Sequence, residues 1–255
     1  DSFFDGGRYR STENIRAKVV SMADEGASII DVGGYSSRPG AGDISDEEEI
    51  DRVMPAIEII RNVLPEMPIS VDTFRSSVVK TVVSHFGGII VNDISGGEID
   101  EKMIETVAML KLPYICMHMR GTPQTMQQFT RYGDVVNEII EKFSFKIRTL
   151  RKAGIHDVVC DPGFGFSKTI DQNFEILNKL EYFKLLDVPI LAGLSRKSMI
   201  WKSLNITPQE ALNGTTALNM IALEKGATIL RVHDIAPAIE IIRLYHKLHN
   251  NGIKS

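Results

Sequence analysis

The feature that most restricts the fold is a repeated alternation between short β-branched runs and longer segments of helical period. Such alternation is typical of βα units, whose strands run parallel in one sheet. The strand-like runs are ASIIDV, PISVD, IIVND, PYICMH, DVVCD, PILAG and TILRVH. The second helical segment has a clear predicted start, because Ser45 and Glu48 form a capping-box pattern ahead of EIDRVMPAIEII.

Two architectures fit seven strands of this kind. A closed (β/α)8 barrel needs eight strands, and the chain opens on the glycine-rich loop Asp5-Gly6-Gly7, with a helix expected near Ser11. The barrel interpretation therefore predicts a first strand just upstream of Asp1. The alternative is an open doubly wound sheet, which accepts six or seven strands. The length and the lack of a linker-like segment predict a single domain over residues 1–255.

Polar side chains follow nearly every predicted strand at its carboxyl end. They are Asp31, Asp72, Asn92, Asp93, His118, Asp161, the Ser195-Arg196-Lys197 turn, Arg231 and His233. In a (β/α)8 barrel these ends converge on the face that carries the active site, whereas a doubly wound sheet uses two or three loops at its switch point. The distribution favours the barrel, although each residue taken singly could be a cap or a turn residue.

Composition excludes several classes of partner. The net charge of -4 gives no general attraction to nucleic acid or to anionic lipid. No apolar run reaches the roughly 18 residues of a membrane span, and DSFFDGGRYR resembles neither a signal nor a transit peptide. We therefore expect a cytoplasmic protein without a nucleic-acid or membrane partner. Cys116 and Cys160 lie in strand-like runs, which predicts buried free thiols.

The stretch VVCDPGFGFSK places a carboxylate, Asp161, at the end of a predicted strand. A buried carboxylate needs a partner, and a planar pair of N–H donors, as on a 2-amino-4-oxo-pyrimidine ring, satisfies it well. Phe164 and Phe166 would then offer stacking surface, and Gly163 and Gly165 would let the backbone approach closely. In the alternative interpretation, Asp161 caps its own turn and the phenylalanines fill the core.

Neighbouring strand ends extend this site. Asp72 and Asn92 would place a second carboxylate and an amide around the same ring, an arrangement that suits a heterocycle becoming cationic. On the opposite rim the converging donors are Arg38, Lys197, Arg231 and His233. Two arginines and a histidine exceed what one carboxylate needs, so this rim is predicted to bind phosphate or diphosphate.

Taken together, the motifs resemble one family, dihydropteroate synthase. They are DSFFDGG, DVGGYSSRPGA, SVDT, VNDI, MHMRGTP, DPGFGF, GLSRKSMI and RVHD, in the order of that family and over essentially the whole chain. The resemblance implies a TIM barrel that condenses 6-hydroxymethyl-7,8-dihydropterin diphosphate with p-aminobenzoate, giving 7,8-dihydropteroate and diphosphate with help from Mg²⁺. It also implies a homodimer in the folate pathway that sulfonamides target.

The resemblance implies a role for each matching residue. The pterin would contact Asp72, Asn92, Ile94, Met117, Asp161, Phe166, Gly193 and Lys197; diphosphate would contact Arg38, Arg231 and His233; p-aminobenzoate would contact Phe3, Ser37, Pro39, Phe166 and Ser198. The catalytic set would be Asp72, Asp161, Lys197, Arg38, Arg231 and His233. The family's metal-ligand asparagine belongs to the first strand, upstream of this chain, so no metal ligand is assigned.

Three positions depart from the family pattern: Phe4 stands where serine is usual, Tyr35 where glutamate is common, and Ser37 where threonine is usual. All three concern the shape of the p-aminobenzoate pocket.

The expected mechanism is dissociative. The C–O bond ionises to a pterin cation stabilised by Asp72, the rim and Mg²⁺ hold the leaving diphosphate, and the neutral arylamine attacks without a covalent enzyme nucleophile. Two alternatives stay open. A methyltetrahydrofolate-corrinoid methyltransferase would have no reason to carry the SRKS and RVHD anion rim. A non-catalytic pterin-binding module could lose Arg38 or His233, both of which are present.

Overall fold

All seven predicted strands are present in the computed structural model, which describes residues 12–37 and 42–250. They are β1 Ile30–Gly33, β2 Ile69–Asp72, β3 Ile90–Asp93, β4 Tyr114–Met117, β5 Val158–Asp161, β6 Leu191–Ala192 and β7 Ile229–Leu230. Each is short and buried or half-buried, and each lies inside its predicted run except that β1 extends one residue further, to Gly33. The predicted opening loop Asp5-Gly6-Gly7 and the helix start at Ser11 lie outside the described residues.

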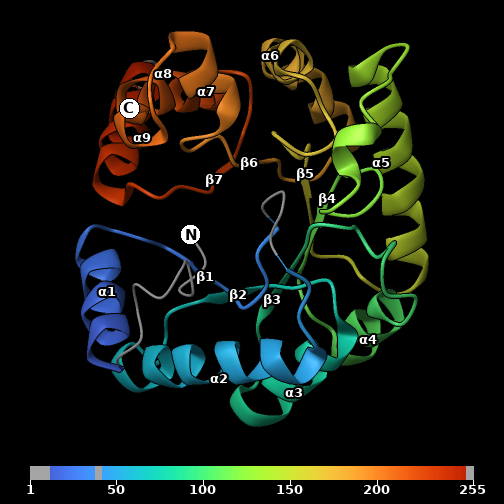
Figure 1. The fold of residues 1–255 in the computed structure, drawn as a ribbon, viewed down its shortest axis with the longest axis vertical. Helices are drawn as coiled ribbons and strands as arrows, with labels where there is room; N and C mark the ends of the chain where they lie inside the picture. Colours follow the sequence, from blue (N-terminus) through green and yellow to red (C-terminus); the bar gives the residue numbers. More distant parts are fainter. Residues whose placement is uncertain (1–11, 38–41, 251–255) are drawn as a thin grey trace.

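Helices alternate with the strands and lie outside them, as Figure 1 shows. They are α1 Thr12–Asp24, α2 Asp46–Val63, α3 Ser76–Phe86, α4 Met103–Leu110, α5 Val135–Lys152, α6 Ile170–Asn178, α7 Ser198–Leu204, α8 Leu212–Glu224 and α9 Ile235–Asn250, with the short 3-10 turns η1 Met126–Gln128, η2 Leu180–Leu186 and η3 Pro208–Glu210. Ser45 caps α2 as predicted, because its hydroxyl accepts from the Glu48 N–H at 3.2 Å. Only this half of the predicted capping box forms, because the Glu48 carboxylate pairs with Arg52.

The order of the strands decides between the two architectures. β1 to β5 pair in parallel in sequence order, a single bridge between Cys160 and Ile190 continues the sheet to β6, and β6 pairs with β7. A doubly wound sheet reverses its order at a switch point, whereas here the order never reverses. The barrel prediction is therefore confirmed. Within the described ranges no ladder joins β7 to β1, and a strand before Asp1 stays a prediction.

The period of two residues along each strand sorts the side chains between two faces. Residues on the outer face pack beneath the helices in the main core, among them Ile30, Val32, Ile69, Val71, Val91, Tyr114, Cys116, Val158 and Cys160. Both cysteines are buried free thiols, as predicted. The opposite face carries Asp31, Ser70, Asp72 and Asn92, and the register sets Asp72 beside Asn92 and Met117 beside Asp161. The polar strand ends therefore share the inner face.

Asp93 belongs to the outer face, so its prediction as a site-facing strand end is wrong. Its Oδ1 accepts from the Ser95 N–H and hydroxyl, both at 2.7 Å, and its Oδ2 accepts from the Gly97 N–H at 2.8 Å and the Tyr114 hydroxyl at 2.7 Å. Both oxygens of the Asp93 carboxylate therefore stabilise the turn that follows β3. Asn92, one residue earlier, points to the inner face because adjacent residues of a strand alternate.

Removing the Tyr114 hydroxyl tests this turn. We expect Tyr114→Phe to lower the free energy of unfolding by about 1–2 kcal/mol, because the buried Asp93 carboxylate loses a donor that water cannot replace. Urea unfolding measures the change. Tyr182→Phe is the control: its side chain is 51% exposed, and we expect a shift below about 0.5 kcal/mol. Equal shifts in the two variants would contradict this account of the turn.

Candidate active site

Asp31 lies at the centre of a polar network inside the barrel. Its carboxylate accepts a short hydrogen bond from Ser70, one from Asn92 Nδ2 at 3.3 Å, and one from Arg231 Nε at 2.7 Å. Burial acts to raise the pKa of Asp31, but Arg231 and these hydrogen bonds outweigh it and lower the pKa. Asp31 is thus an ionised carboxylate. Sequence analysis noted it as a strand end and gave it no role.

Arg231 joins a second carboxylate to the same network. Its Nη2 lies 2.6 Å from Asp31 Oδ2 and 3.1 Å from Asp72 Oδ2. Burial raises the pKa of Asp72 to about 7; Arg231 opposes this shift and the charge of Asp31 adds to it. Asp31 and Asp72 in turn raise the pKa of Arg231, which stays charged. Residues predicted for the pterin and for the diphosphate therefore meet at one point.

Asp161 combines the two roles that sequence analysis had set against each other. Its side chain is 6% exposed, and its Oδ1 accepts from the Gly163 N–H at 2.7 Å, so it does cap its own turn. Its Oδ2 accepts no hydrogen bond from the described residues. Burial raises the pKa of Asp161, with Lys197 opposing. One carboxylate oxygen therefore serves the turn, and the other is available to a ligand.

Lys197 approaches the same turn from the loop after β6. Its ammonium donates a short hydrogen bond to the Phe164 carbonyl and lies 5.0 Å from the centre of the Phe166 ring. Burial lowers its pKa to about 8, against the attraction of Asp161. Arg196, next to it, donates from Nε and Nη2 to Asp234, both at 2.8 Å, and so fixes the backbone that presents Lys197. The lysine is consequently held beside Asp161 and Phe166.

The two phenylalanines of DPGFGF lie in different environments. Phe164 is 0% exposed in the main core, so its predicted stacking role is wrong and the core-filling interpretation holds. Phe166 is half-buried and packs against a smaller apolar cluster at the carboxyl ends of the strands. The members of that cluster are Tyr35, Phe74, Ile94, Met117, Met119 and Met126. The predicted pterin contacts Ile94, Met117 and Phe166 are thus brought together; Phe74, Met119 and Met126 were missed.

Gly163 permits a close approach between two strand ends. Its φ is +73°, and a Cβ built on it would lie 2.1 Å from the His118 carbonyl oxygen. Gly165 also has a positive φ, +82°, and faces the Lys197 side chain, while a Cβ on Gly193 would lie 3.7 Å from Lys197 Nζ. The close approach at Gly163 is to the backbone that follows β4, and the approach of these glycines to a ligand stays a prediction.

A buried lysine that sequence analysis missed, Lys168, holds this turn from behind. Its Nζ donates to the carbonyls of Phe166 at 2.9 Å, Gly163 at 3.1 Å and His118 at 3.3 Å, and lies 3.1 Å from His118 Nδ1. Burial lowers the pKa of both Lys168 and His118. His118 is therefore a neutral part of the scaffold. The available signal was a lysine two residues beyond the GFGF run.

His233 sits at the other rim. Its Nδ1 lies 2.8 Å from the Ser195 hydroxyl, which also accepts from the His233 N–H at 3.2 Å. Burial, together with positive charges that include Arg231, lowers its pKa to about 3, so the imidazole is neutral near pH 7. Ser198 is the first residue of α7, and Ser37 follows Tyr35 by two residues; both are half-buried. Phe3, Phe4, Arg38 and Pro39 lie outside the described residues.

The described residues contain no group of three or more His, Cys, Asp or Glu side chains placed to hold a metal ion. Two carboxylates of the inner-face network, Asp31 and Asp72, are bound by Arg231. Among the described helices, none combines the length and the hydropathy needed to cross a membrane.

Comparison with known proteins assigns this geometry to a family. The family profile described as "Pterin binding enzyme" matches residues 1–233. Dihydropteroate synthase of Synechocystis sp. is 41% identical over 96% of this chain and 85% of its own length. A Yersinia pestis dihydropteroate synthase structure with a sulfonamide drug superimposes with a TM-score of 0.91 at 36% identity, covering 98% of this chain and 90% of the other. A Xanthomonas albilineans structure with 4-aminobenzoic acid gives 0.86 at 34% identity, covering 97% and 88%.

The fold is thus that of a (β/α)8 pterin-binding enzyme. Within that class, the chain belongs to the dihydropteroate synthase family, as the sequence motifs predicted. It is accordingly an enzyme of folate biosynthesis and a transferase.

Gly163 provides a test of how the Asp161 turn is held. We expect Gly163→Ala to destabilise the protein by at least about 3 kcal/mol, from the positive φ together with the clash at the His118 carbonyl. Gly154→Ala is the control, because Gly154 has a φ of +94° but open space around it; its expected cost is about 1–2 kcal/mol. Urea unfolding of both variants decides. Equal losses would mean that the contact at His118 contributes nothing.

Proposed function

We propose that this chain performs the dihydropteroate synthase reaction with the inner-face residues as its pterin site. The observation that supports this most directly is the convergence of a half-buried acid, Asp72, and a buried acid, Asp161, with Asn92, Lys197 and Arg231 at one end of the barrel. These groups offer acceptors to ring N–H donors and a cation to an anionic leaving group.

The pterin is proposed to lie with its polar edge on Asp161 and one face against three apolar side chains at the carboxyl ends of the strands. Oδ2 of Asp161 would accept from the 2-amino and ring N–H groups, which form a planar donor pair. Ile94, Met117 and Phe166 supply the apolar surface, and Asn92 supplies amide donors and an acceptor. Lys197 and the Gly193 backbone border the remaining edge.

The chemical step is proposed to be dissociative. The C–O bond to the diphosphate breaks with its electron pair leaving on oxygen, and the resulting pterin cation is stabilised by the negative charges of Asp72 and Asp31. The p-aminobenzoate nitrogen then forms the new C–N bond and loses a proton. Since Arg231 already holds both carboxylates in place, little reorganisation is needed as the cation develops.

Diphosphate is proposed to bind at Arg231 and His233, with Arg38 as a further ligand outside the described residues. Arg231 bonds to the two acids through Nε and Nη2, and its Nη1 donates to none of the described residues. Nη1 could therefore serve a diphosphate oxygen without releasing the acids. The neutral His233 imidazole can donate from Nε2 if its Nδ1 accepts from the Ser195 hydroxyl.

p-Aminobenzoate is proposed to bind between Phe166, Ser198 and Ser37, with Phe3 and Pro39 as further predicted contacts. Relatives with 4-aminobenzoic acid and with a sulfonamide drug support this, because a sulfonamide resembles the aminobenzoate ring. On the same grounds we propose that sulfonamides inhibit this enzyme.

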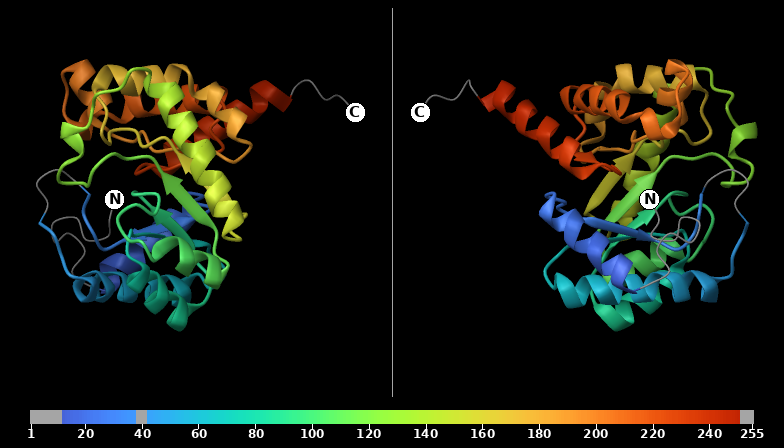
Figure 2. Two further views of the ribbon diagram at one scale, coloured as in Figure 1. Left: turned by 90° about the vertical axis from the view of Figure 1, so that its right-hand side faces the viewer. Right: turned by 60° about the vertical axis from the view of Figure 1, so that its left-hand side comes forward.

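We further propose Mg²⁺ as a cofactor, a homodimer and a cytoplasmic location. Mg²⁺ commonly binds through substrate phosphates and one or two carboxylates, so it would arrive with the diphosphate and offset its charge. The dimer is supported by exposed apolar side chains on the last three helices, namely Leu204, Ile221, Leu244 and Leu248. Figure 2 shows that the end of α9 projects from the rest of the molecule. Light scattering of the purified protein tests the dimer.

The reaction is tested by measuring diphosphate release from the pterin diphosphate with and without p-aminobenzoate. We expect release that depends on p-aminobenzoate, together with 7,8-dihydropteroate as product. A non-catalytic pterin-binding module would bind the pterin and release no diphosphate. A methyltetrahydrofolate-corrinoid methyltransferase would be inactive with these substrates and would demethylate methyltetrahydrofolate.

Asp161→Asn tests the pterin edge. We expect pterin binding to weaken by roughly 2–4 kcal/mol, because an amide presents N–H donors to the ring's own donors. Its amide oxygen can still accept from the Gly163 N–H, so the turn should persist. Calorimetry with a bare pterin measures the loss. Asp93→Asn, a buried acid on the outer face, should leave the affinity unchanged; a loss below about 0.5 kcal/mol in Asp161→Asn would restrict Asp161 to its turn.

The pH dependence of kcat/KM should be bell-shaped. Asp72 must be ionised to stabilise a cation, and since its raised pKa is about 7, the rate should fall as pH falls below that value. Lys197 must be protonated to hold the site's positive charge, and with a pKa of about 8 the rate should fall above that value.

The variants assign the two limbs. Asp72→Asn should be slow and should lose the acidic limb, while Lys197→Arg should move the alkaline limb upward. Both variants use the same substrate as the wild type. A limb caused by titration of the substrate diphosphate would therefore stay unchanged in the variants, and that result would contradict the assignment to Asp72 and Lys197.

A further inference from the structure

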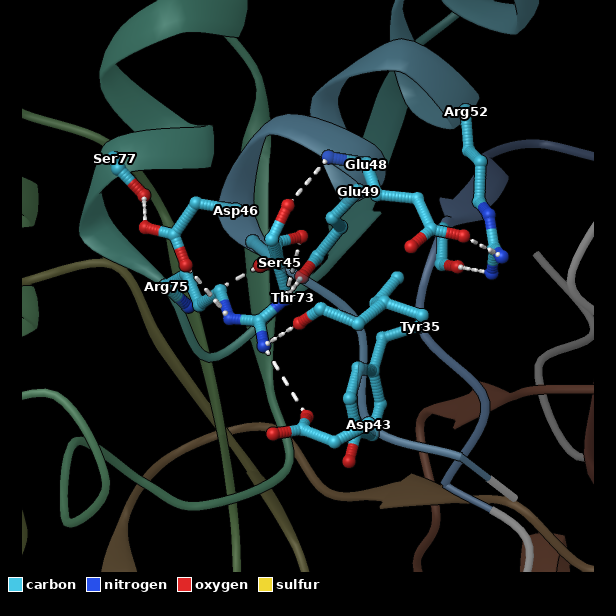
Figure 3. Close-up of polar contacts among 12 residues, drawn as sticks. Tyr35, Asp43, Ser45, Asp46, Glu48, Glu49, Arg52, Thr73, Arg75 and Ser77 are labelled. Atoms are coloured by element: carbon cyan, nitrogen blue, oxygen red, sulfur yellow. Dashed lines mark hydrogen bonds and ion pairs between the residues drawn. The ribbon is translucent and has the colours of Figure 1, made fainter.

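A second polar network lies at the start of α2 and α3, apart from the inner-face carboxylates, and Arg75 is its centre (Figure 3). Arg75 follows Asp72 by three residues, in the turn between β2 and α3. Its side chain is only 13% exposed. None of the functions proposed above uses this residue, although it makes more charged contacts than any rim residue described.

The first group of contacts binds Arg75 to the segment that leads into α2. Nη2 donates to the Ile44 carbonyl at 2.5 Å and Nη1 to the Ser45 carbonyl at 3.4 Å. The same guanidinium pairs with three acids of this region, namely Asp43 at 3.4 Å, Asp46 at 3.0 Å and Glu49 at 2.6 Å. Residues 43–46 are therefore fixed to the end of β2 by one side chain.

The ion pair between Arg75 and Glu49 is buried. Its side chain is 0% exposed, and burial raises its pKa although Arg75 acts in the opposite direction. A buried carboxylate needs a paired cation, so the charge of Arg75 is required where it lies. A guanidinium suits the position better than an ammonium, because its planar fork reaches several acceptors and packs on aromatic rings.

The second group of contacts binds Arg75 to the end of β1. Its guanidinium carbon lies 5.4 Å from the centre of the Tyr35 ring and 5.2 Å from that of Phe74, and these two rings pack edge to face at 4.9 Å. The Tyr35 hydroxyl in turn accepts a short hydrogen bond from Gln124. Tyr35 also belongs to the apolar cluster of Ile94 and Met117.

The residue before Tyr35 is fixed to the same helix. The Gly34 carbonyl accepts from Arg52 Nη1 at 3.1 Å, and a Cβ on Gly34 would lie 2.8 Å from the Glu49 carbonyl oxygen. Gly34 thus rests directly on the first turns of α2. Arg75 consequently contacts both described arms of the loop after β1: Tyr35 on one arm and residues 43–45 on the other. Ser37 lies two residues beyond Tyr35.

We propose that Arg75 is a positioning residue for the second, arylamine substrate. It holds Tyr35 and residues 43–45 in place and thereby sets the position of Ser37. This inference rests on the proposed function, because it takes Ser37 as part of the p-aminobenzoate pocket. Arg75 itself touches no substrate. The polar edge of the pterin site comes instead from side chains on β3 and β5: the Asn92 amide donates to Asp31, and the Asp161 carboxylate accepts from the Gly163 N–H.

Arg75→Lys is the test, with steady-state kinetics for both substrates and calorimetry with a bare pterin. A misplaced pocket should weaken one substrate selectively, so we expect the KM for p-aminobenzoate to rise at least about tenfold, since small displacements of positioning groups cost that much. The affinity for bare pterin and the KM for the pterin diphosphate should stay within about twofold of wild type.

Arg61→Lys is the matched control. Arg61 also joins loop carbonyls, donating to Met67 at 2.8 Å and to Pro65 and Gly88, each at 3.2 Å, but it does so at the amino ends of the strands, opposite the site. A loss of stability without a change in either KM is expected there. A rise in the p-aminobenzoate KM in both variants would indicate general loosening and would overturn the proposal.

Further outcomes separate the positioning role from the proposed function. Unchanged kinetics in a folded Arg75→Lys protein would reject the positioning role, and so would equal increases in both KM values. If wild-type enzyme releases no diphosphate with p-aminobenzoate, the proposed function itself fails. Should Arg75→Lys not fold, Tyr35→Leu removes the ring beneath the guanidinium and must raise the p-aminobenzoate KM selectively; an unchanged KM in that variant would reject the proposal.

Discussion

The bridge from Arg231 to Asp31 and Asp72 is the interaction on which the rest of the site depends. Two carboxylates on neighbouring strands repel each other, and burial makes both costly unless a cation is shared between them. Arg231 comes from the loop after β7, 200 residues beyond Asp31. The bridge therefore ties the last described strand to the first two, and it holds two acids at fixed positions on the inner face.

The loops around this face are held by residues that do no chemistry. Lys168 binds three carbonyls behind the Asp161 turn, and Arg196 pairs with Asp234 behind Lys197. Arg75 has a similar place behind the loop after β1. In each case one basic side chain donates to several acceptors from different segments. Such support matters because a reacting group misplaced by an ångström loses much of its effect.

Several site residues could be predicted because their chemistry is visible in one short motif. Asp161 within DPGFGF and the cations of SRKS and RVHD needed only the rule that barrel strand ends converge. Asp93 and Phe164 were misassigned because a motif does not say which face a side chain takes. Lys168 and Arg75 were missed because their partners are mostly backbone carbonyls and acids of other segments, brought close only by folding.

By itself the sequence determined the strands, the helices between them and the family, since the hydrophobic period and the short motifs are local properties that can be read from the sequence alone. Tertiary structure alone decided which acid binds which cation. Asp31, Asp72 and Arg231 meet because the sheet curves until distant strand ends share one face. It also decided the protonation of Asp72 and Lys197, because burial and the surrounding charges set a pKa, and neither exists before the chain is folded.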